Sequence, residues 1–183
     1  MAEATEATLR DWIGPGLHIL SIGINPSIYS VELGFNFARP GNRFWPAVNA
    51  SGLLQAPVQP GKEAMKTLLE RDRIGFTDIV KRATRKAAEL DENDYRRGAR
   101  LLLRKLERHS PRIAWFQGTS ACAKFFEHAL DIRRKVAPGL QPERLGQTRL
   151  FVTPNPSGTN PAANPKALLA HLQQLAEIKR KLA

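Results

Sequence analysis

Residues 17–27 read LHILSIGINPS, a short apolar run that leads into a polar turn containing a proline. Gly16 and Gly23 bound the apolar part, whose length and composition indicate a buried β-strand. Two later runs have the same character, namely RIAWFQ at 112–117 and RLFVT at 149–153. Three stretches show helical spacing of apolar residues, at 61–71, 94–108 and 166–181. Asn164 and Pro165 are typical of the start of the last of these helices. Strands that alternate with helices predict an α/β fold whose mostly parallel sheet is covered on both faces.

The polar turns after the predicted strands are the first candidates for a functional site, because ligands bind beyond the carboxyl ends of strands in such sheets. These turns are GINPS at 23–27, GTS at 118–120 and PNPSGTNP at 154–161. Two of them contain Asn-Pro-Ser, at 25–27 and 155–157. Turn formation alone explains one such tripeptide, since Asn, Pro and Ser favour turns. Two of them at strand ends predict a rigid polar pocket, although the pattern does not identify its ligand.

The composition favours one globular domain that spans residues 1–183, with 1–15 as a loosely ordered N-terminal segment. Hydrophobic residues make up 42% of the chain, which is enough for a substantial core. Lys and Arg number 28 against 17 Asp and Glu, which gives a net charge of +11. Such an excess favours a polyanionic partner, most simply nucleic acid, over a basic enzyme without one.

The cysteine content and the N-terminus indicate the cellular compartment. Cys122 is the single cysteine, so an intramolecular disulfide and a four-cysteine metal site are excluded. Glu3 and Glu6 stand where a signal peptide carries positive charge, and no apolar segment follows them. No run approaches the roughly 18 apolar residues of a membrane span. We therefore expect a cytoplasmic protein that makes no membrane contact. We also expect it to be a monomer.

Three segments in order resemble the bacterial mismatch-specific uracil-DNA glycosylases and the animal thymine-DNA glycosylases. GINPS at 23–27 and FNFARPGNRFW at 35–45 match the family pattern GINPG followed by F-x-F-A-x-P-x-N-R-F-W. NPSG at 155–158 matches the second motif, and IGFTDIVKRAT at 74–84 is similar to G-[FV]-T-x-[LIM]-V-x-R-x-T. The resemblance covers about residues 17–158. It implies a three-layer α/β/α sandwich, base flipping on DNA that contains uracil, and no metal or cofactor.

The chemistry of that family explains why such residues are needed. A base inside a duplex must be swung out into a pocket before its glycosidic bond can be reached. The uracil anion is a fairly good leaving group, so fixed backbone donors can supply much of the catalysis. A polar side chain must then place a water against the anomeric carbon.

The resemblance assigns these roles to individual residues. Asn25 orients the water, and Phe37 stacks on the flipped base; closing a turn and packing the core are the respective alternatives. The base pocket includes Ile24, Ser27, Phe37 and Asn155. Contacts with DNA come from Ser157, Gly158, Thr159 and Asn160. The signature residues 42–45 are expected to open a helix and pack it.

Three positions depart from the family pattern. Asp78 stands where several relatives carry Lys or Asn, and it is either a second catalytic group or a surface carboxylate paired with Lys81 or Arg82. Thr159 and Pro161 replace the apolar wedge and its neighbour, which weakens the expected recognition of an opposing guanine. Ser27 replaces a Gly near the 5-position of the base.

The remaining charges are less informative. Arginines recur every four residues at 96, 100, 104 and 108, which favours a solvated helix face over a phosphate site. Arg133, Arg134 and Lys135 fall in a predicted loop and are better phosphate candidates. None of the four histidines lies in a motif. The alternative function is a non-catalytic nucleic-acid-binding domain that retains the pocket. A nucleotide-binding protein is excluded, because this sequence contains neither of the glycine-rich motifs that bind nucleotide phosphates.

Overall fold

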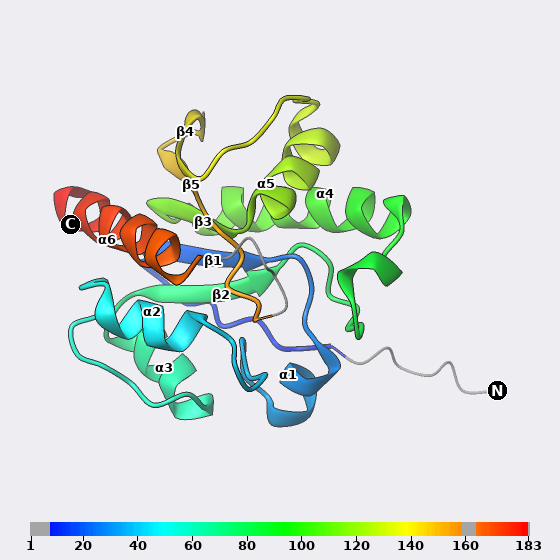
Figure 1. The fold of residues 1–183 in the computed structure, drawn as a ribbon. Helices are drawn as coiled ribbons and strands as arrows, with labels where there is room; N and C mark the ends of the chain where they lie inside the picture. Colours follow the sequence, from blue (N-terminus) through cyan, green and yellow to red (C-terminus); the bar gives the residue numbers. More distant parts are fainter. Residues whose placement is uncertain (1–7, 159–163, 183) are drawn as a thin grey trace.

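The computed structural model describes residues 8–158 and 164–182, and its centre is a five-stranded sheet (Figure 1). The strands are β1 (Ile19–Gly23), β2 (Ile74–Asp78), β3 (Ile113–Gln117), β4 (Gly139–Leu145) and β5 (Thr148–Thr153). Their order across the sheet is β2-β1-β3-β5-β4. Strands β2, β1, β3 and β5 are parallel, and β4 pairs with β5 as an antiparallel edge strand.

Helices cover both faces of this sheet, which confirms the predicted three-layer α/β/α arrangement (Figure 1). They are α1 (Ile28–Leu33), α2 (Phe44–Ala50), α3 (Lys62–Glu70), α4 (Glu92–His109), α5 (Thr119–Phe125) and α6 (Pro165–Leu182), with a 3-10 turn η1 (Ala87–Glu89) and a π-helical turn η2 (Phe126–Leu130). Successive strand residues point to opposite faces. Ile113 and Trp115 therefore pack in a core with α2, α3 and α6, whereas Ala114 and Phe116 pack in a second core with α4 and α5.

Three strands and three helices lie where the periodicity predicts them, with boundaries shifted by one or two residues. The cap of α6 is also confirmed, since the Asn164 Oδ1 accepts a hydrogen bond of 2.9 Å from the Lys166 backbone N–H. Strand β4 escaped prediction because its residue types do not follow its burial: Leu140 is exposed whereas Gln141 is buried, and Pro142 is a residue that central strands avoid. Strand β2 is only five residues long, and all five are buried, so it has no alternation to detect.

The N-terminal segment is more firmly held than expected. Trp12 forms a bridge with Phe76 through backbone hydrogen bonds of 2.9 and 2.8 Å, so it extends the sheet beyond β2. A Cβ atom on Gly75 would lie 2.6 Å from the Trp12 carbonyl oxygen, which explains the glycine in β2. Leu9 and Trp12 are buried. Residues 8–15 are thus part of the fold, and our expectation of a loosely ordered 1–15 is wrong for this portion.

No helix within the described residues is long and apolar enough to cross a membrane.

Candidate active site

A cavity of about 750 Å³ opens at the carboxyl ends of the parallel strands. We call it the strand-end pocket. Four strand ends contribute to its wall: the GINPS turn after β1, Asp78 at the end of β2, Gln117 at the end of β3, and Asn155 with Ser157 after β5. The loop between α1 and α2 adds Asn36, Phe37, Arg39 and Asn42. The structure therefore brings two of the three predicted turns together, at 23–27 and 154–161, although they are far apart in sequence. The third, at 118–120, contributes no lining residue, and β3 reaches the pocket through Gln117 instead.

The side-chain amide of Asn25 is fixed in one orientation. Its Nδ2 donates to the Arg82 carbonyl oxygen at 2.9 Å and to the Thr84 Oγ1 at 2.8 Å. Because a carbonyl oxygen can only accept, this contact identifies which end of the amide carries the hydrogens. Both hydrogens are thereby used, and Oδ1 remains as an acceptor at the strand-end pocket.

Backbone hydrogen bonds hold the GINPS turn against the segment after β2. The carbonyl oxygens of Gly23 and Ile24 each accept at 2.9 Å, from Ile79 and Val80 respectively. Ser27 caps α1, since its Oγ accepts a hydrogen bond of 3.1 Å from the Ser30 N–H. Ile24 and Ser27 both line the strand-end pocket, as expected.

Phe37 is both a packing residue and a pocket residue. Its ring stacks on Phe44 with 4.0 Å between centroids and an interplanar angle of 14°. It also lines the strand-end pocket. Its backbone has a φ of 58°, a left-handed conformation that costs a bulky L-residue about 1–2 kcal/mol. Such strain persists where the surroundings determine it, often at functional sites. The signature residues 42–45 behave as expected, because Asn42 Oδ1 accepts from the Phe44 N–H and α2 begins there.

Asp78 is buried, with 5% of its surface exposed, so it is not the surface carboxylate of the alternative interpretation. Its register partner in β1 is Gly23, and a Cβ there would lie 2.5 Å from the Asp78 Oδ1. Its Oδ2 has no hydrogen-bond partner among the described residues, and the Lys81 Nζ lies 3.9 Å away. Burial raises the pKa of Asp78 to about 6, although the charge of Lys81 opposes the shift. Arg82 pairs with Asp94 instead, at 2.5 Å.

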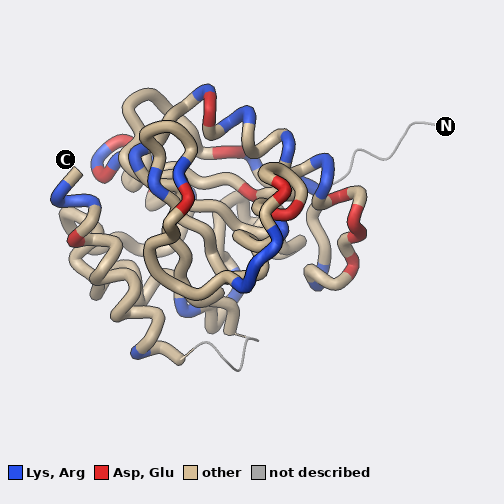
Figure 2. The backbone as a smooth tube through the Cα atoms, turned by 90° about the horizontal axis from the view of Figure 1, so that it is seen from above, with Lys and Arg blue, Asp and Glu red and all other residues tan. Residues whose placement is uncertain are grey.

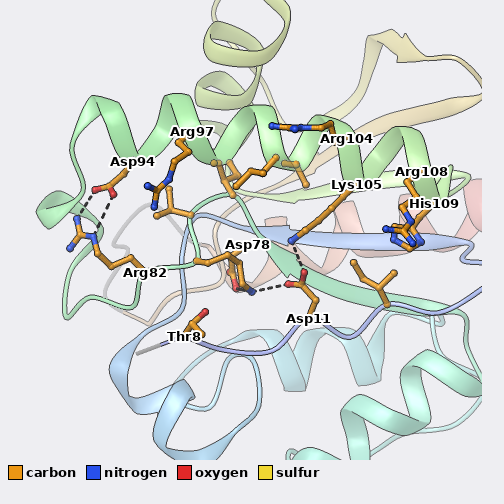
Figure 3. A pocket seen from close by; sticks show the side chains of 17 residues that line it. Thr8, Asp11, Asp78, Arg82, Asp94, Arg97, Arg104, Lys105, Arg108 and His109 are labelled. Carbon is orange, nitrogen blue, oxygen red and sulfur yellow. Dashed lines mark hydrogen bonds and ion pairs between the residues drawn. The ribbon is translucent and has the colours of Figure 1, made fainter. Parts of the chain in front are cut away.

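Behind Asp78 lies a second cavity of about 700 Å³, which runs between α4 and the N-terminal segment (Figure 3). We call it the side groove. Asp11 accepts from Lys81 at 2.7 Å, from Lys105 at 2.5 Å and from the Thr77 Oγ1 at 2.7 Å. Burial alone would raise the pKa of Asp11, but Lys81 and Lys105 outweigh it and the pKa is lowered. Asp78 lines both cavities, so this charged network faces the back of the strand-end pocket.

The second motif contributes Asn155 and Ser157 to the strand-end pocket. The Asn155 Oδ1 accepts a hydrogen bond of 2.9 Å from the Ser157 N–H, and both residues line the strand-end pocket. A Cβ on Gly118 would approach the Asn155 Cβ to 3.1 Å. Gly158 lies against the loop before α2, where a Cβ would meet the Gly41 carbonyl oxygen at 2.7 Å. Thr159 and Asn160, the other predicted DNA contacts, lie outside the described residues.

Three pocket residues escaped the sequence analysis. Gln117 is buried, and its Nε2 donates to the Ser21 Oγ at 2.9 Å. Thr84 holds Asn25. Asn36 is also buried and lines the pocket, and it is the middle residue of the F-x-F pattern in the sequence. A polar residue inside that aromatic pattern is the signal by which Asn36 could have been found.

The basic residues do not gather on one face. Figure 2 shows Lys and Arg along much of the chain, interspersed with Asp and Glu. Arg134 is not the phosphate candidate that we expected, because it forms two hydrogen bonds with Glu143, at 2.7 and 2.6 Å. The arginines at 96, 100, 104 and 108 are exposed on α4. Exposed cations that line the strand-end pocket are Arg39, Arg85 and Lys86.

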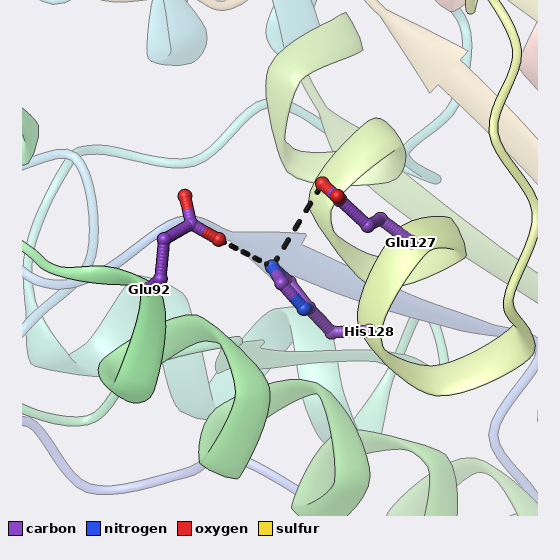
Figure 4. Close-up of side chains that lie close together, drawn as sticks. All are labelled: Glu92, Glu127 and His128. Atoms are coloured by element: carbon purple, nitrogen blue, oxygen red, sulfur yellow. Dashed lines mark ion pairs between the residues drawn. The ribbon is translucent and has the colours of Figure 1, made fainter.

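One cluster away from the pocket has metal-ligand side chains. Glu92 of α4 and Glu127 and His128 of η2 place their ligand atoms within 4.8 Å of one another (Figure 4). Lys124 already pairs with Glu92 and lies 3.9 Å from Glu127. The cluster is therefore accounted for as an ion-pair network that joins α4 to the turn after α5.

The comparisons with known proteins agree with this geometry. The fold is similar to the solution NMR structure of a candidate uracil DNA glycosylase from Methanosarcina acetivorans, with a TM-score of 0.60 and 23% identity over 97% of this chain and 98% of that chain. At that identity the likeness concerns the fold. The family model described as "Uracil DNA glycosylase superfamily" matches residues 11–176, which include every described residue of the strand-end pocket except Leu9. Because this match spans most of the sequence, the chain belongs to the uracil DNA glycosylase superfamily.

Proposed function

We propose that this chain is a monofunctional uracil-DNA glycosylase of the mismatch-specific type, with residues 1–183 as one catalytic domain. It hydrolyses the N-glycosidic bond of uracil that has been flipped out of DNA, and the reaction needs no metal or cofactor. The observation that carries the proposal is the orientation of Asn25, whose amide hydrogens are both engaged so that its oxygen is left as an acceptor at the pocket.

In this reaction a water donates a hydrogen bond to the Asn25 Oδ1 and attacks the anomeric carbon of the deoxyribose. The new bond joins the water oxygen to that carbon, and the glycosidic bond breaks with its electron pair on N1 of uracil. The sugar is oxocarbenium-like at the transition state, as in glycoside hydrolysis. An amide is not a base, so Asn25 orients the water without removing its proton.

Asp78 supplies the negative charge and the proton acceptor that Asn25 does not provide. As a carboxylate behind Gly23 it stabilises the developing positive charge on the sugar and accepts the proton of the attacking water. With a pKa of about 6, it is largely ionised near neutral pH and still basic enough to take a proton. Phe37 offers its ring as a platform for the flipped base, and Asn155 borders the same cavity.

The direct test is release of uracil from labelled oligonucleotides that carry uracil opposite guanine, opposite adenine or in a single strand. We expect release from all three, because Thr159 is a small wedge and Pro161 has no N–H to offer the opposite base. Strict dependence on guanine would contradict the expected substrate range. Binding of DNA without any release would favour the non-catalytic alternative.

The Asn25→Ala variant tests the mechanism. Loss of water positioning is expected to slow single-turnover release at least about a hundredfold, equivalent to about 3 kcal/mol, with DNA binding nearly intact. Asn49→Ala is a matched control, since the Asn49 amide lies outside the pocket and bonds to the Val58 backbone at 2.9 and 3.0 Å. Near-normal release by Asn25→Ala would refute the assignment.

A further inference from the structure

Asn36 is held in place by the aromatic residues on either side of it. The centroids of the Phe35 and Trp45 rings lie 6.3 Å apart, and the Phe37 ring stacks on the Phe44 ring. The Trp45 Nε1 also donates to the Phe37 carbonyl oxygen at 3.2 Å. The backbone on both sides of Asn36 is therefore anchored to α2, and its side chain lines the strand-end pocket.

The amide of Asn36 lacks the partners that the other amides of the pocket have. Only 7% of the residue is exposed, yet its Oδ1 has no hydrogen-bond partner among the described residues. By contrast, Gln117 donates to Ser21 and accepts from Thr153. The Asn25 amide is held by Arg82 and Thr84.

A buried amide without a partner lowers the stability of the free protein, because it has lost its hydrogen bonds to water. A ligand that completes its hydrogen bonds is one reason for a protein to retain such a group. A carboxamide offers one acceptor beside two donors, so its complement is an N–H beside a carbonyl oxygen. Uracil carries that arrangement at its imide edge, where N3–H is flanked by O2 and O4.

We infer that Asn36 is a base-recognition residue, whose amide pairs with the imide edge of the flipped uracil. This inference rests on the proposed function and deepens it. Consecutive residues of one loop then divide the work, since Phe37 stacks on the face of the base while Asn36 binds its edge. The N3–H of uracil donates to Oδ1, and a neighbouring carbonyl oxygen accepts from Nδ2.

The kinetic test combines a variant with a modified base. Single-turnover release is measured for uracil and for 3-methyluracil, in which a methyl group replaces the N3 hydrogen, with wild type and Asn36→Ala. A bidentate contact of this kind discriminates by about 1–3 kcal/mol, so we expect Asn36→Ala to release uracil about ten- to a hundredfold more slowly. The 3-methyl group is expected to slow wild type by a similar factor and to have little effect on the variant, because both changes remove the same contact.

Stability provides a second measurement that does not depend on substrate. Asn36→Leu keeps the approximate size of the side chain and removes the unpartnered polar atoms, so its melting temperature is expected to equal or exceed that of wild type while its activity falls. A purely structural Asn36 predicts the opposite, a lower melting temperature. Asn49→Leu is the control, since it removes an amide with two hydrogen bonds and is expected to melt at a lower temperature with unchanged release of uracil.

The outcomes separate the two claims. If wild type releases uracil while Asn36→Ala matches it in rate and in sensitivity to 3-methylation, only the inference about Asn36 is overturned. If wild type releases no uracil, the proposed function fails, and recognition of uracil by Asn36 fails with it.

Discussion

Asn25 and Asp78 reach the pocket from the ends of adjacent strands, but in different states. The Asn25 amide is fixed by two short hydrogen bonds, whereas the Asp78 carboxylate has an oxygen with no hydrogen-bond partner among the described residues. A buried carboxylate that lacks donors is costly to ionise, which is why its pKa is raised. Under the proposed mechanism, this arrangement places a carboxylate beside the sugar, and its burial lowers the stability of the folded protein at neutral pH.

The Asp78→Asn variant separates these two effects. We expect single-turnover release to fall roughly ten- to a thousandfold, the range of one positioned acid–base group, and the acid limb near pH 6 to disappear. Stability is expected to rise at neutral pH. A carboxyl whose pKa is raised from 3.8 to about 6 binds more protons in the folded state between these values, so wild-type stability falls as pH rises through them.

At neutral pH this cost is on the order of 3 kcal/mol, and the gain of the variant should vanish below about pH 4. Chemical denaturation at several pH values measures the gain, and quenched-flow or gel assays measure the release of uracil. An unchanged rate constant would leave Asn25 as the catalytic side chain and assign Asp78 a structural role.

The network in the side groove gives a second residue-scale prediction, with opposite signs for two variants. The Lys81 Nζ lies 2.7 Å from an Asp11 oxygen and 3.9 Å from an Asp78 oxygen, so its positive charge interacts with both carboxylates. Its charge lowers the pKa of Asp78, and the charge of Asp11 raises it. Lys81→Met should therefore move the acid limb of release to higher pH, and Asp11→Asn should move it to lower pH.

The pH profile of single-turnover release reports these shifts, and the carbon-13 resonance of the Asp78 carboxyl reports them without substrate. Lys105→Met is a useful third variant, because Lys105 lowers the pKa of Asp78 from α4 and should shift the limb in the same direction as Lys81→Met. Shifts of equal sign for Lys81→Met and Asp11→Asn would contradict this electrostatic effect on the pKa of Asp78. They would mean that the two variants change the pH profile through a change in structure.

Some residues of the candidate site could be predicted from the sequence, and others could not. Asn25, Ser27, Phe37 and Asn155 follow strands or belong to motifs, and the structure places all four at one pocket. The burial of Asp78 could not be predicted, because it depends on an edge strand that shows no alternation and on the return of the N-terminal segment beside it. Asn36 needed the structure as well, since only three-dimensional contacts show that its amide lacks partners among the described residues.

At the scale of elements, the position of Asp78 depends on how closely α4 approaches the segment after β2. Gly98 makes this approach possible, because a Cβ at that position would lie 2.3 Å from the Ile79 carbonyl oxygen. Ile79 directly follows Asp78, so the contact between α4 and the site is one residue from the carboxylate. The long amphipathic helix was predictable from its apolar spacing, but this close contact was not, because spacing does not reveal which turn meets another backbone.

Gly98→Ala tests that contact. In an exposed helix the change to Ala stabilises by about 1 kcal/mol, but here the clash with a backbone carbonyl should reverse the sign and destabilise by about 1–3 kcal/mol. Gly14→Ala is the matched control, since its Cβ would meet Leu69 at an ordinary 3.7 Å. We expect the control to be within about 0.5 kcal/mol of wild type or slightly more stable. Denaturation midpoints measure both, and a more stable Gly98→Ala would mean that α4 lies farther from Ile79.

At the scale of the whole molecule, the net charge of +11 indicates a polyanionic partner without indicating where it binds. Many basic residues are already paired, among them Arg82 with Asp94 and Arg134 with Glu143. Two exposed sets remain of interest. One comprises Arg85 and Lys86 at the strand-end pocket, and the other comprises Arg104 and Arg108 along α4 and the side groove. If DNA delivers its base to the strand-end pocket, the first set meets the phosphates next to the flipped nucleotide.

The salt dependence of binding distinguishes these two surfaces. Each phosphate contact contributes about 0.9 to the slope of log K against log salt concentration, so replacing Arg85 and Lys86 by Ala should reduce the magnitude of that slope by about 1.8. Replacing Arg104 and Arg108 by Ala lowers the net charge equally, by two from +11 to +9, and therefore controls for long-range attraction. We expect this control to leave the slope nearly unchanged. Fluorescence anisotropy with an oligonucleotide that carries a non-hydrolysable deoxyuridine analogue measures both slopes under conditions without turnover. An equal reduction by the two double variants would mean that the DNA backbone also follows α4, and a reduction by the α4 variant alone would move the DNA path from the pocket rim to the side groove.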